Sequence, residues 1–468
     1  MKVLTKHRIS FSNRNAGVQQ LGWAQGEMLS YIHSRGDEPL LYITKFAALE
    51  DGAVDVRGVL EGIRLTFEDN DALRTRYVLC EGQWRQEIMG SGEIIVTEVS
   101  SPSPRPDLDE VATLLGRLSP EPGEIPVRAA MVTFEGRPVY VYLAVHHASV
   151  DNMGAGIACE ELRRRILGLA TLTASSWQPH DIAEFEASPA GRALAERSDR
   201  YHRVKIRELA DFDAPPADRT TTAMREYQLR SPAVVVAAQQ ISRSLNVSAF
   251  TVTLAAYCLA LSARLSMDRF PLALTSGNRF SPKLRMSIAK LAQSSSISVD
   301  LTSSTFEDFC RQTNNATLLA YRHAVYDPDL RAELFREAGA ERGKDVFFPY
   351  LANFHVTTVL EDLDPESRRD RQRQVEANLD VRPEELRKLL AQGVSGATPS
   401  DEIRFSDLSL DIYEFSEQAD MRLTTDLAFF SDAVLRSLLL TTERLLVEVA
   451  CGNGKADMRG LLDFCPTF

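Results

Sequence analysis

Two spacings of apolar residues predict most of the secondary structure in the first half of the chain. Apolar runs and period-two alternation predict a strand at Leu40–Leu49 and a β-hairpin made by Val127–Phe134 and Val139–Val145. Apolar residues at helical spacing predict helices at Val54–Phe67 and Gly154–Leu169. The first half therefore mixes strands with helices that can pack against them.

The second half shows the same mixture. Ser231–Leu245, capped by Ser231, and Ser248–Leu265 are predicted helices, and Ser431–Cys451 is a closing helix. A long apolar strand is predicted at Asp345–Val359. The remaining predicted strands and helices are Leu73–Leu79, Trp84–Met89, Leu108–Leu118, Ala190–Leu209, Thr220–Leu229, Phe270–Ser276, Ser295–Leu301, Thr305–Arg322, Ile403–Phe415 and Met421–Phe429. The predicted fold class is α/β, or α+β.

The length of the chain and one irregular stretch predict two domains. A chain of 468 residues is too long for one ordinary core, and two domains of about 200 residues fit it. Between residues 171 and 218 the regular pattern weakens and prolines gather, which places the boundary there. We assign residues 1–185 to the first domain and residues 186–468 to the second. The charged stretch Glu361–Ser400 is predicted to be a surface excursion of the second domain.

Composition and charge exclude several classes of function. The formal net charge of −12 argues against a general nucleic-acid binder, since such proteins need a basic surface. The six cysteines have neither CxxC nor zinc-finger spacing, so we expect no metal site. The N-terminus lacks the apolar core of a signal peptide, and the longest apolar stretch, Ala249–Leu265, is shorter than a membrane span. We therefore expect a cytoplasmic protein that binds neither nucleic acid nor membrane.

The segment with the most specific chemistry follows the second strand of the hairpin. It reads Ala144-Val145-His146-His147-Ala148-Ser149-Val150-Asp151-Asn152-Met153-Gly154, so two histidines leave a strand and an aspartate follows four residues after the second. Three interpretations are open: an ordinary loop edge, a pair of metal ligands, or one histidine facing a site and the other facing the core. Neighbouring side chains of a strand point to opposite faces and do not easily share one ion, which favours the third.

This segment resembles the HHxxxDG signature of nonribosomal peptide synthetase condensation domains, within the chloramphenicol acetyltransferase superfamily. Glu68–Tyr77, which contains Leu73-Arg74-Thr75, is similar to the family's RHExLRTxF segment, although the leading Arg-His is lost. Gly17–Trp23 and Asp181–Glu186 resemble the first and fourth family motifs, and Asn278–Gln293 resembles the stretch before the fifth. These segments stand in family order along nearly the whole chain, which is identified on that basis as a member of the family.

The resemblance implies both a fold and an activity. The fold is two chloramphenicol-acetyltransferase-like subdomains in a V-shaped pseudo-dimer with a central tunnel. The activity is an acyltransferase reaction of natural-product biosynthesis, joining a carrier-bound acyl or aminoacyl thioester to an amine or alcohol as an amide or ester. The phosphopantetheine arm of an acyl or peptidyl carrier protein supplies the thioester, so we expect no bound cofactor. No segment resembles an adenylation or carrier domain, so we expect a free-standing enzyme. Many carrier proteins are acidic, and an acidic enzyme would need local basic patches to bind one.

The resemblance also assigns roles to the motif residues. His147 matches the histidine beside the reacting groups, as a base or as a positioning group. Asp151 is expected to support the site through an ion pair with Arg74. His146 is expected to be a packed, hydrogen-bonded core histidine. Asn152 replaces the family's glycine, and because asparagine tolerates positive φ we expect the turn to persist with some strain.

Other positions and other functions stay open. Asn353 and His355 share a face of the predicted strand Asp345–Val359 and are candidates for substrate contacts or for buried hydrogen bonds. Asn152 is an alternative contributor to an acceptor channel. The alternative functions are an acyl-CoA-dependent acyltransferase of the same superfamily and a degenerate recruitment module, although the intact His147 argues against the second. An epimerase would share the HHxxxD motif, but epimerases are normally fused to a carrier domain.

Overall fold

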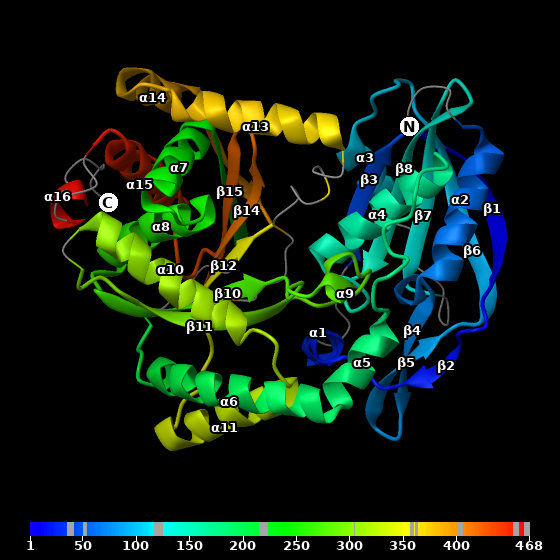
Figure 1. Cartoon of the computed structure of the whole chain (residues 1–468), viewed down its shortest axis with the longest axis horizontal. Helices are drawn as coiled ribbons and strands as arrows, with labels where there is room; N and C mark the ends of the chain where they lie inside the picture. The colour runs from blue at the N-terminus through cyan, green and yellow to red at the C-terminus, as the bar shows by residue number, and fades with distance from the viewer. Residues whose placement is uncertain are drawn as a thin grey trace. The chain divides into compact units, whose positions relative to one another are not determined.

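The chain forms two compact units (Figure 1). The computed structural model describes residues 1–34, 42–49, 54–116, 125–214, 223–303, 305–355, 360, 364–400, 406–452 and 458–462. Unit 1 consists of Met1–Leu194 and Gly277–Ala292, and unit 2 of Ala195–Ser276 and Gln293–Phe468. The segment Gly277–Ala292, which the sequence pattern placed in the second domain, thus packs with the first unit.

Unit 1 is built on a five-stranded sheet with the strand order β1-β6-β7-β8-β3. β6 and β7 pair parallel, and the other neighbours pair antiparallel. A smaller sheet has the order β2-β5-β4. The strands are β1 Lys2–Ser12, β2 Gly17–Gln19, β3 Tyr42–Ala48, β4 Thr75–Cys80, β5 Gln83–Ile88, β6 Ser91–Ser100, β7 Val127–Phe134 and β8 Arg137–His146. The helices are α1 Trp23–Ser34, α2 Val56–Asp69, the 3₁₀ helix η1 Asp71–Arg74, α3 Leu108–Gly116, α4 Asn152–Ile166, α5 Pro179–Ala187 and α9 Pro282–Arg285.

Helices cover both faces of the five-stranded sheet. α2 and α4 pack against each other, and between them they contact β1, β3 and β8. α3 contributes Val111 to an apolar cluster on the face that carries Tyr142 and Ala144. Because both faces are covered, β8 is buried at every position from Val141 to His146. A strand that ends inside the protein in this way delivers the residues that follow it to a shielded position.

Unit 2 is built on a seven-stranded sheet with the order β11-β10-β12-β14-β15-β9-β13. β12 pairs parallel with β10 and β14, and the other pairs are antiparallel. The strands are β9 Met224–Ser231, β10 Arg269–Ser276, β11 Gln293–Asp300, β12 Tyr350–Phe354, β13 Val394–Pro399, β14 Leu408–Phe415 and β15 Ala419–Asp426. The helices are α6 Pro189–Ala210, which begins in unit 1, α7 Pro232–Leu245, α8 Ala249–Leu265, α10 Phe306–Arg322, α11 Pro328–Arg342, α13 Pro365–Leu379, α14 Pro383–Leu389, η2 Leu390–Gln392, α15 Asp432–Ala450 and α16 Met458–Leu462.

The core of unit 2 surrounds α8. Every residue of α8 from Phe250 to Ser262 is buried, and α7, α10 and α15 pack around it. No single helix among the described residues is long and apolar enough to cross a membrane. α7 and α8 meet that test only as a pair, but the chain bends by 108° between them. Their burial within one apolar core explains their composition.

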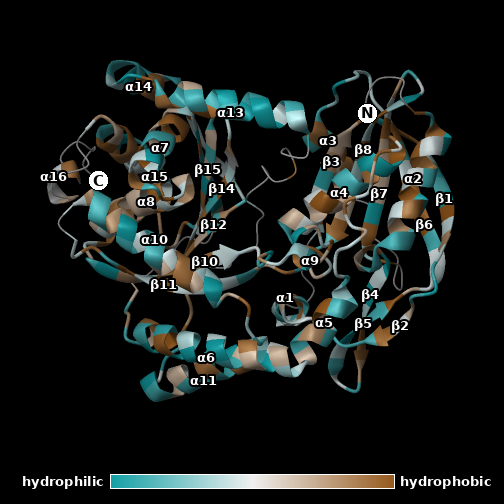
Figure 2. Cartoon of the chain, viewed as in Figure 1, coloured by the Kyte–Doolittle hydropathy of each residue, from teal (hydrophilic) through white to brown (hydrophobic). Residues whose placement is uncertain are grey.

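Most predicted elements are present, and the differences have local causes. Several elements were not predicted, among them β1, α1, β6 and α11. β1 consists mostly of exposed residues, and α11 has apolar residues at few positions. The described part of Glu361–Ser400 lies mostly at the surface, as predicted, although β13 pairs with β9 and α14 packs on α7. α13 in the same stretch is hydrophilic along most of its length (Figure 2). Residues 40–41, 117–118, 220–222, 356–359, 361–363 and 403–405 of predicted segments lie outside the described residues.

The cap of α7 should stabilise unit 2 more than an ordinary helix cap. The Ser231 hydroxyl accepts a hydrogen bond from the Val234 N–H (3.2 Å) and donates one to the buried Glu443 carboxyl (2.5 Å). Ser231→Ala removes the cap and leaves Glu443 without this donor, so we expect a loss of about 2–3 kcal/mol. Thr305→Ala, at the exposed cap of α10, should lose about 1 kcal/mol. Urea unfolding of the two variants checks the difference, and equal midpoints would argue against it.

Candidate active site

A tight turn between β8 and α4 carries His147. β8 ends at His146, whose backbone carbonyl accepts hydrogen bonds from the N–H groups of Ser149 (2.9 Å) and Val150 (3.3 Å). α4 begins at Asn152, with Asp151 as its N-cap. His147 therefore lies just beyond the strand. The alternation of side chains along a strand, which separated the two histidines in the sequence analysis, therefore does not extend to it.

His147 is neutral, and one of its ring nitrogens is available. Its Nδ1 lies 2.9 Å from the Val150 carbonyl oxygen, which can only accept, so Nδ1 carries the proton. Nε2 then presents a lone pair, and no described residue forms a hydrogen bond with it. Burial, and next the positive charge of Lys290, lower the pKa of His147 to about 3. The arrangement suits a group that accepts a hydrogen bond or a proton at Nε2.

His146 supports the turn from inside the sheet. It is buried, its Nδ1 accepts a hydrogen bond from the Ala148 N–H (3.3 Å), and its ring packs edge-on against Tyr42. Burial lowers its pKa to about 4. A buried, hydrogen-bonded and neutral ring agrees with the packing role expected for this residue.

Asp151 binds two separate parts of unit 1 through its two carboxylate oxygens. Oδ1 accepts from the Gly154 N–H (2.8 Å), which caps α4. Oδ2 accepts from Arg279 Nη1 (2.8 Å) and from the backbone N–H groups of Leu291 and Ala292 (both 2.9 Å). Burial alone would raise the pKa of Asp151, but the Arg279 charge and these donors outweigh it and hold that pKa at about 2. The carboxylate is thus ionised and fully engaged in holding the turn, which leaves it no reactive role.

The predicted ion pair between Asp151 and Arg74 is wrong. Arg279 is the partner of Asp151, and it also donates to the carbonyl oxygens of Gly277 (3.0 Å) and Ala289 (3.2 Å). Arg279 thereby links the two ends of the segment Gly277–Ala292 and attaches this segment to the HHxxxD turn. Arg279 lies in the stretch Asn278–Gln293 that resembles the family, but the resemblance assigns it no role.

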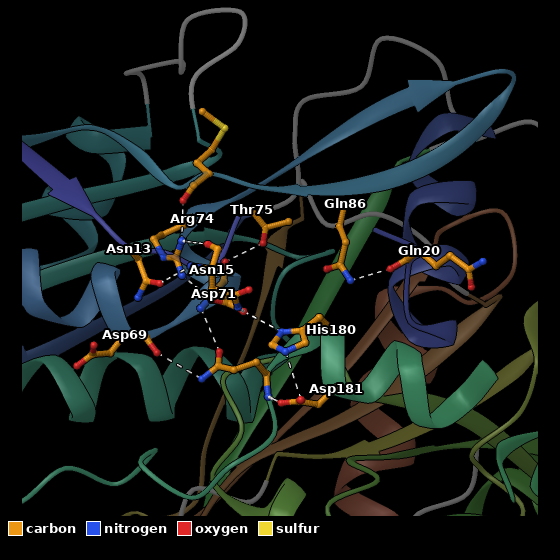
Figure 3. A network of polar contacts seen from close by, with 12 residues as sticks. Asn13, Asn15, Gln20, Asp69, Asp71, Arg74, Thr75, Gln86, His180 and Asp181 are labelled. Carbon is orange, nitrogen blue, oxygen red and sulfur yellow. Dashed lines mark hydrogen bonds and ion pairs between the residues drawn. The ribbon is translucent and has the colours of Figure 1, made fainter. Parts of the chain in front are cut away.

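Arg74 supports a different part of unit 1 (Figure 3). Its fully buried guanidinium pairs with Asp71 in the preceding 3₁₀ turn (2.5 Å) and donates to the carbonyl oxygens of Asn15 (3.0 Å) and Met89 (2.6 Å). Asp71 also contacts His180 Nδ1 on α5 (2.9 Å). The network joins the loop after β1, the end of β5 and α5, so Arg74 is a structural residue away from the turn of His147.

Asn152 does not strain the turn. It is the first residue of α4 and is not among the described residues with positive φ, so the strain expected there is wrong. The close approach occurs at Gly154 instead, where a Cβ atom would lie 2.7 Å from the Ala289 carbonyl oxygen. Glycine is therefore required at Gly154, two residues after the position where the family has it.

Lys290 is a charged residue of the site that the sequence did not indicate. Its side chain is 8% exposed, and Nζ donates to the Ala292 carbonyl oxygen (2.7 Å). Burial lowers the pKa of Lys290, while the negative charge of Asp151 opposes that shift. After burial, its positive charge is the main cause of the lowered pKa of His147, because it disfavours the imidazolium. No run or spacing in the sequence distinguishes this lysine from others.

The comparisons with known proteins identify the fold. No protein-family model matches the sequence, and no curated protein matches it. The condensation domain of the Monacolin K polyketide synthase MokA aligns with a TM-score of 0.72 at 13% identity, over 95% of this chain and 100% of that one. The chain has the condensation-domain fold. SgcC5 from Streptomyces globisporus aligns with a TM-score of 0.68 at 15% identity, over 94% of this chain and 100% of that one. A structure described for condensation-domain-mediated chain release from the enacyloxin polyketide synthase has a TM-score of 0.68 at 16% identity, over 95% and 84%.

Within the condensation fold, Asn353 and His355 belong to unit 2. Asn353 lies opposite Asp411 in the pairing of β12 with β14. His355 Nε2 lies 2.8 Å from the Asp411 carboxylate and 3.0 Å from Asn353 Nδ2, and its ring stacks on Tyr413. The two residues therefore contact each other, as their shared face predicted. Their contact with substrate stays a prediction, as does the V-shaped arrangement with a tunnel.

Replacement of Arg279 should destabilise unit 1. Arg279→Gln removes the positive charge from a buried carboxylate, so we expect a loss of about 3–5 kcal/mol. Arg285→Gln, an exposed arginine of the same segment, is the control and should change stability little.

Asp151→Ala should give poorly folded protein, measured by yield and thermal unfolding. Soluble Asp151→Ala with normal melting and no turnover would contradict this structural role.

His146 should make stability depend on pH. Its pKa is about 4 in the folded chain and about 6.5 when unfolded, so below pH 6.5 the unfolded chain binds the extra proton. Stability should therefore fall as pH falls, by about 2 kcal/mol from this residue between pH 7 and pH 5. His146→Asn keeps an acceptor for Ala148 and should flatten the curve by that amount in denaturant titrations. Parallel curves for the two proteins would refute it.

Proposed function

We propose that the chain is a condensation enzyme that transfers an acyl or aminoacyl group from a carrier-bound thioester to an amine or alcohol acceptor. The observation that carries this proposal is His147, a neutral histidine with its Nε2 available, held in an HHxxxD turn of a condensation fold. The phosphopantetheine arm of an acyl or peptidyl carrier protein belongs to the substrate. As part of the proposal, the enzyme is free-standing and receives the carrier in trans.

The reaction needs one nucleophile, one electrophile and one proton transfer. The acceptor nitrogen or oxygen attacks the thioester carbonyl carbon, and the carbon–sulfur bond breaks as the new amide or ester forms. The proton lost by the acceptor ends on the sulfur of the released phosphopantetheine thiol. Nε2 of His147 can accept the hydrogen bond of the acceptor N–H or O–H and pass the proton on.

The electrostatics of the site favour hydrogen bonding over full proton abstraction. A histidine whose pKa is lowered to about 3 is a weak base. Protonating His147 fully would place a positive charge in a buried position near Lys290, which costs free energy. A neutral Nε2 can still accept a hydrogen bond from the incoming nucleophile and so point the nucleophile's lone pair at the thioester carbon. This hydrogen bond creates no new charges. His147 therefore acts mainly by positioning the acceptor, with proton transfer completed as the thiol leaves.

Loss of His147 should remove most of the activity without unfolding the protein. His147→Ala should lower kcat/KM by about 10²–10⁴-fold, the usual contribution of such a group. Its thermal unfolding should match the wild type within a few degrees, because only the Val150 hydrogen bond is lost. His33→Ala, at an exposed histidine in the last turn of α1, is the control. Full activity of His147→Ala would favour a recruitment module instead.

A panel of loaded carrier proteins defines the donor. Single-turnover reactions compare the same acyl group on a separate carrier protein and on coenzyme A, with product detected by mass. Faster transfer from the carrier supports the proposal. Equal or faster transfer from coenzyme A would indicate the acyl-CoA-dependent alternative; one starter condensation domain of this fold was solved with C8-CoA.

A further inference from the structure

Unit 2 carries a group of exposed arginines with no acidic partner. Arg197 and Arg200 lie one turn apart on α6, and Arg322 is the last residue of α10. All three are exposed, and no described residue forms an ion pair with any of them. Arg203 of the same helix differs, since it pairs with Asp199 and Glu337. Unpaired positive charge in a chain of net charge −12 calls for an explanation.

Buried aromatic contacts hold the two helices together at this point. The ring of His323, directly after α10, stacks on Tyr201 of α6 with centroids 4.9 Å apart. The His323 carbonyl oxygen accepts a hydrogen bond from His202 Nε2 (2.9 Å), and the Tyr201 hydroxyl donates to the Ser296 carbonyl (2.6 Å). In Figure 1 the end of α10 accordingly lies next to α6. Arg322 directly precedes His323, and Arg200 and Arg197 precede Tyr201 by one and four residues, so this stack brings the three arginines near one another. Burial first, and then these three charges, lower the pKa of His323.

Helix stability does not account for the group. A cation at the C-terminal end of a helix is favourable, which is a sufficient reason for Arg322. Arg197 and Arg200, however, lie well before the end of α6 at Ala210, and Arg197 has no acidic residue three or four positions away. Glu196 stands four residues before Arg200, at helical spacing, but it forms no ion pair among the described residues. Three like charges held close together cost free energy, which an anionic partner would recover.

Exposed leucines adjoin the charges. Leu318 and Leu319 are 60% and 47% exposed, and they precede Arg322 by four and three residues on α10. At those spacings the three side chains share one face of the helix. Large exposed apolar groups beside charge are typical of a surface that a protein partner covers. We call Arg197, Arg200, Leu318, Leu319 and Arg322 the arginine patch.

We propose that the arginine patch is the docking surface for an acidic carrier protein, with the arginines facing its carboxylates and the leucines contacting an apolar side chain of its surface. The proposal rests on the function proposed above, because it names where the thioester donor binds. Opposite charges at the rim of an interface speed association and make it depend on salt, while the apolar contact slows dissociation. A net acidic enzyme needs such a local surface to attract an acidic partner at all.

The test compares charge reversal in the patch with charge reversal elsewhere in unit 2. The probe is a dye-labelled acyl carrier protein of net negative charge that carries its phosphopantetheine arm, and binding is read by fluorescence anisotropy at low and high salt. The variant is Arg197→Glu/Arg200→Glu/Arg322→Glu. The control is Arg243→Glu, an exposed arginine on α7 without an ion pair among the described residues. Leu318→Ser/Leu319→Ser probes the apolar part.

We expect the triple variant to bind the carrier at least about tenfold more weakly and to lose most of the salt dependence. The leucine variant should weaken binding at high salt as well, and Arg243→Glu should bind like the wild type. With a carrier-bound donor, KM should rise in the triple variant. With the same acyl group on N-acetylcysteamine, kcat/KM should be unchanged, which also shows that the variant is folded.

Two outcomes overturn the proposal. One is a triple variant that binds the carrier like the wild type with the same salt dependence. The other is a wild type that shows no salt-dependent binding to any acidic carrier in the panel. Failure of the proposed function gives a different result. In that case neither the carrier-bound nor the N-acetylcysteamine thioester supports acyl transfer, and His147→Ala has no effect.

Discussion

The carboxylate of Asp151 connects two parts of unit 1 that are about 140 residues apart in the sequence. A buried carboxylate is costly unless its lone pairs are satisfied, and here Gly154, Arg279, Leu291 and Ala292 supply four donors. The same contacts begin α4 and hold the segment Gly277–Ala292. The position of His147, four residues before Asp151, depends on this attachment. The chemistry proposed for His147 thus rests on a residue that takes no part in it.

Neutral His147 follows from the same construction. The turn that Asp151 closes brings the Val150 carbonyl to Nδ1, which selects the tautomer with the lone pair on Nε2. The segment that Asp151 holds brings Lys290 close enough to disfavour the imidazolium. Backbone geometry therefore sets the tautomer, and burial, followed by one lysine, keeps the ring neutral. No partner carboxylate on the ring is involved among the described residues, in contrast to many acid–base sites.

The sequence predicted the parts of this protein that depend on local pattern. The hairpin of β7 and β8, and α7 with its cap at Ser231, have strong periodicity and were found nearly at their predicted bounds. β1 and β13 were missed because their residues are mostly exposed and polar, so that pairing with a neighbour, and not burial, makes them strands. His147 and Asp151 were found through the family-like motif. The partner of Asp151 was not, because resemblance names residues without pairing them, and Arg74 has a nearer acid in Asp71. No pattern in the sequence indicated Lys290, because its effect on the pKa of His147 arises only from the packing of Gly277–Ala292 into unit 1.

The return of Gly277–Ala292 to unit 1 limits how the gene can be divided or recombined. A break after Leu194 would yield an N-terminal fragment that has His147 and Asp151 but lacks Arg279, Lys290 and the two N–H groups on Oδ2. A chimaera that exchanges the C-terminal half alone would place a foreign loop against the donor's own HHxxxD turn. The motif and the segment that holds it are far apart in the gene, yet they must be inherited together for either to keep its structure.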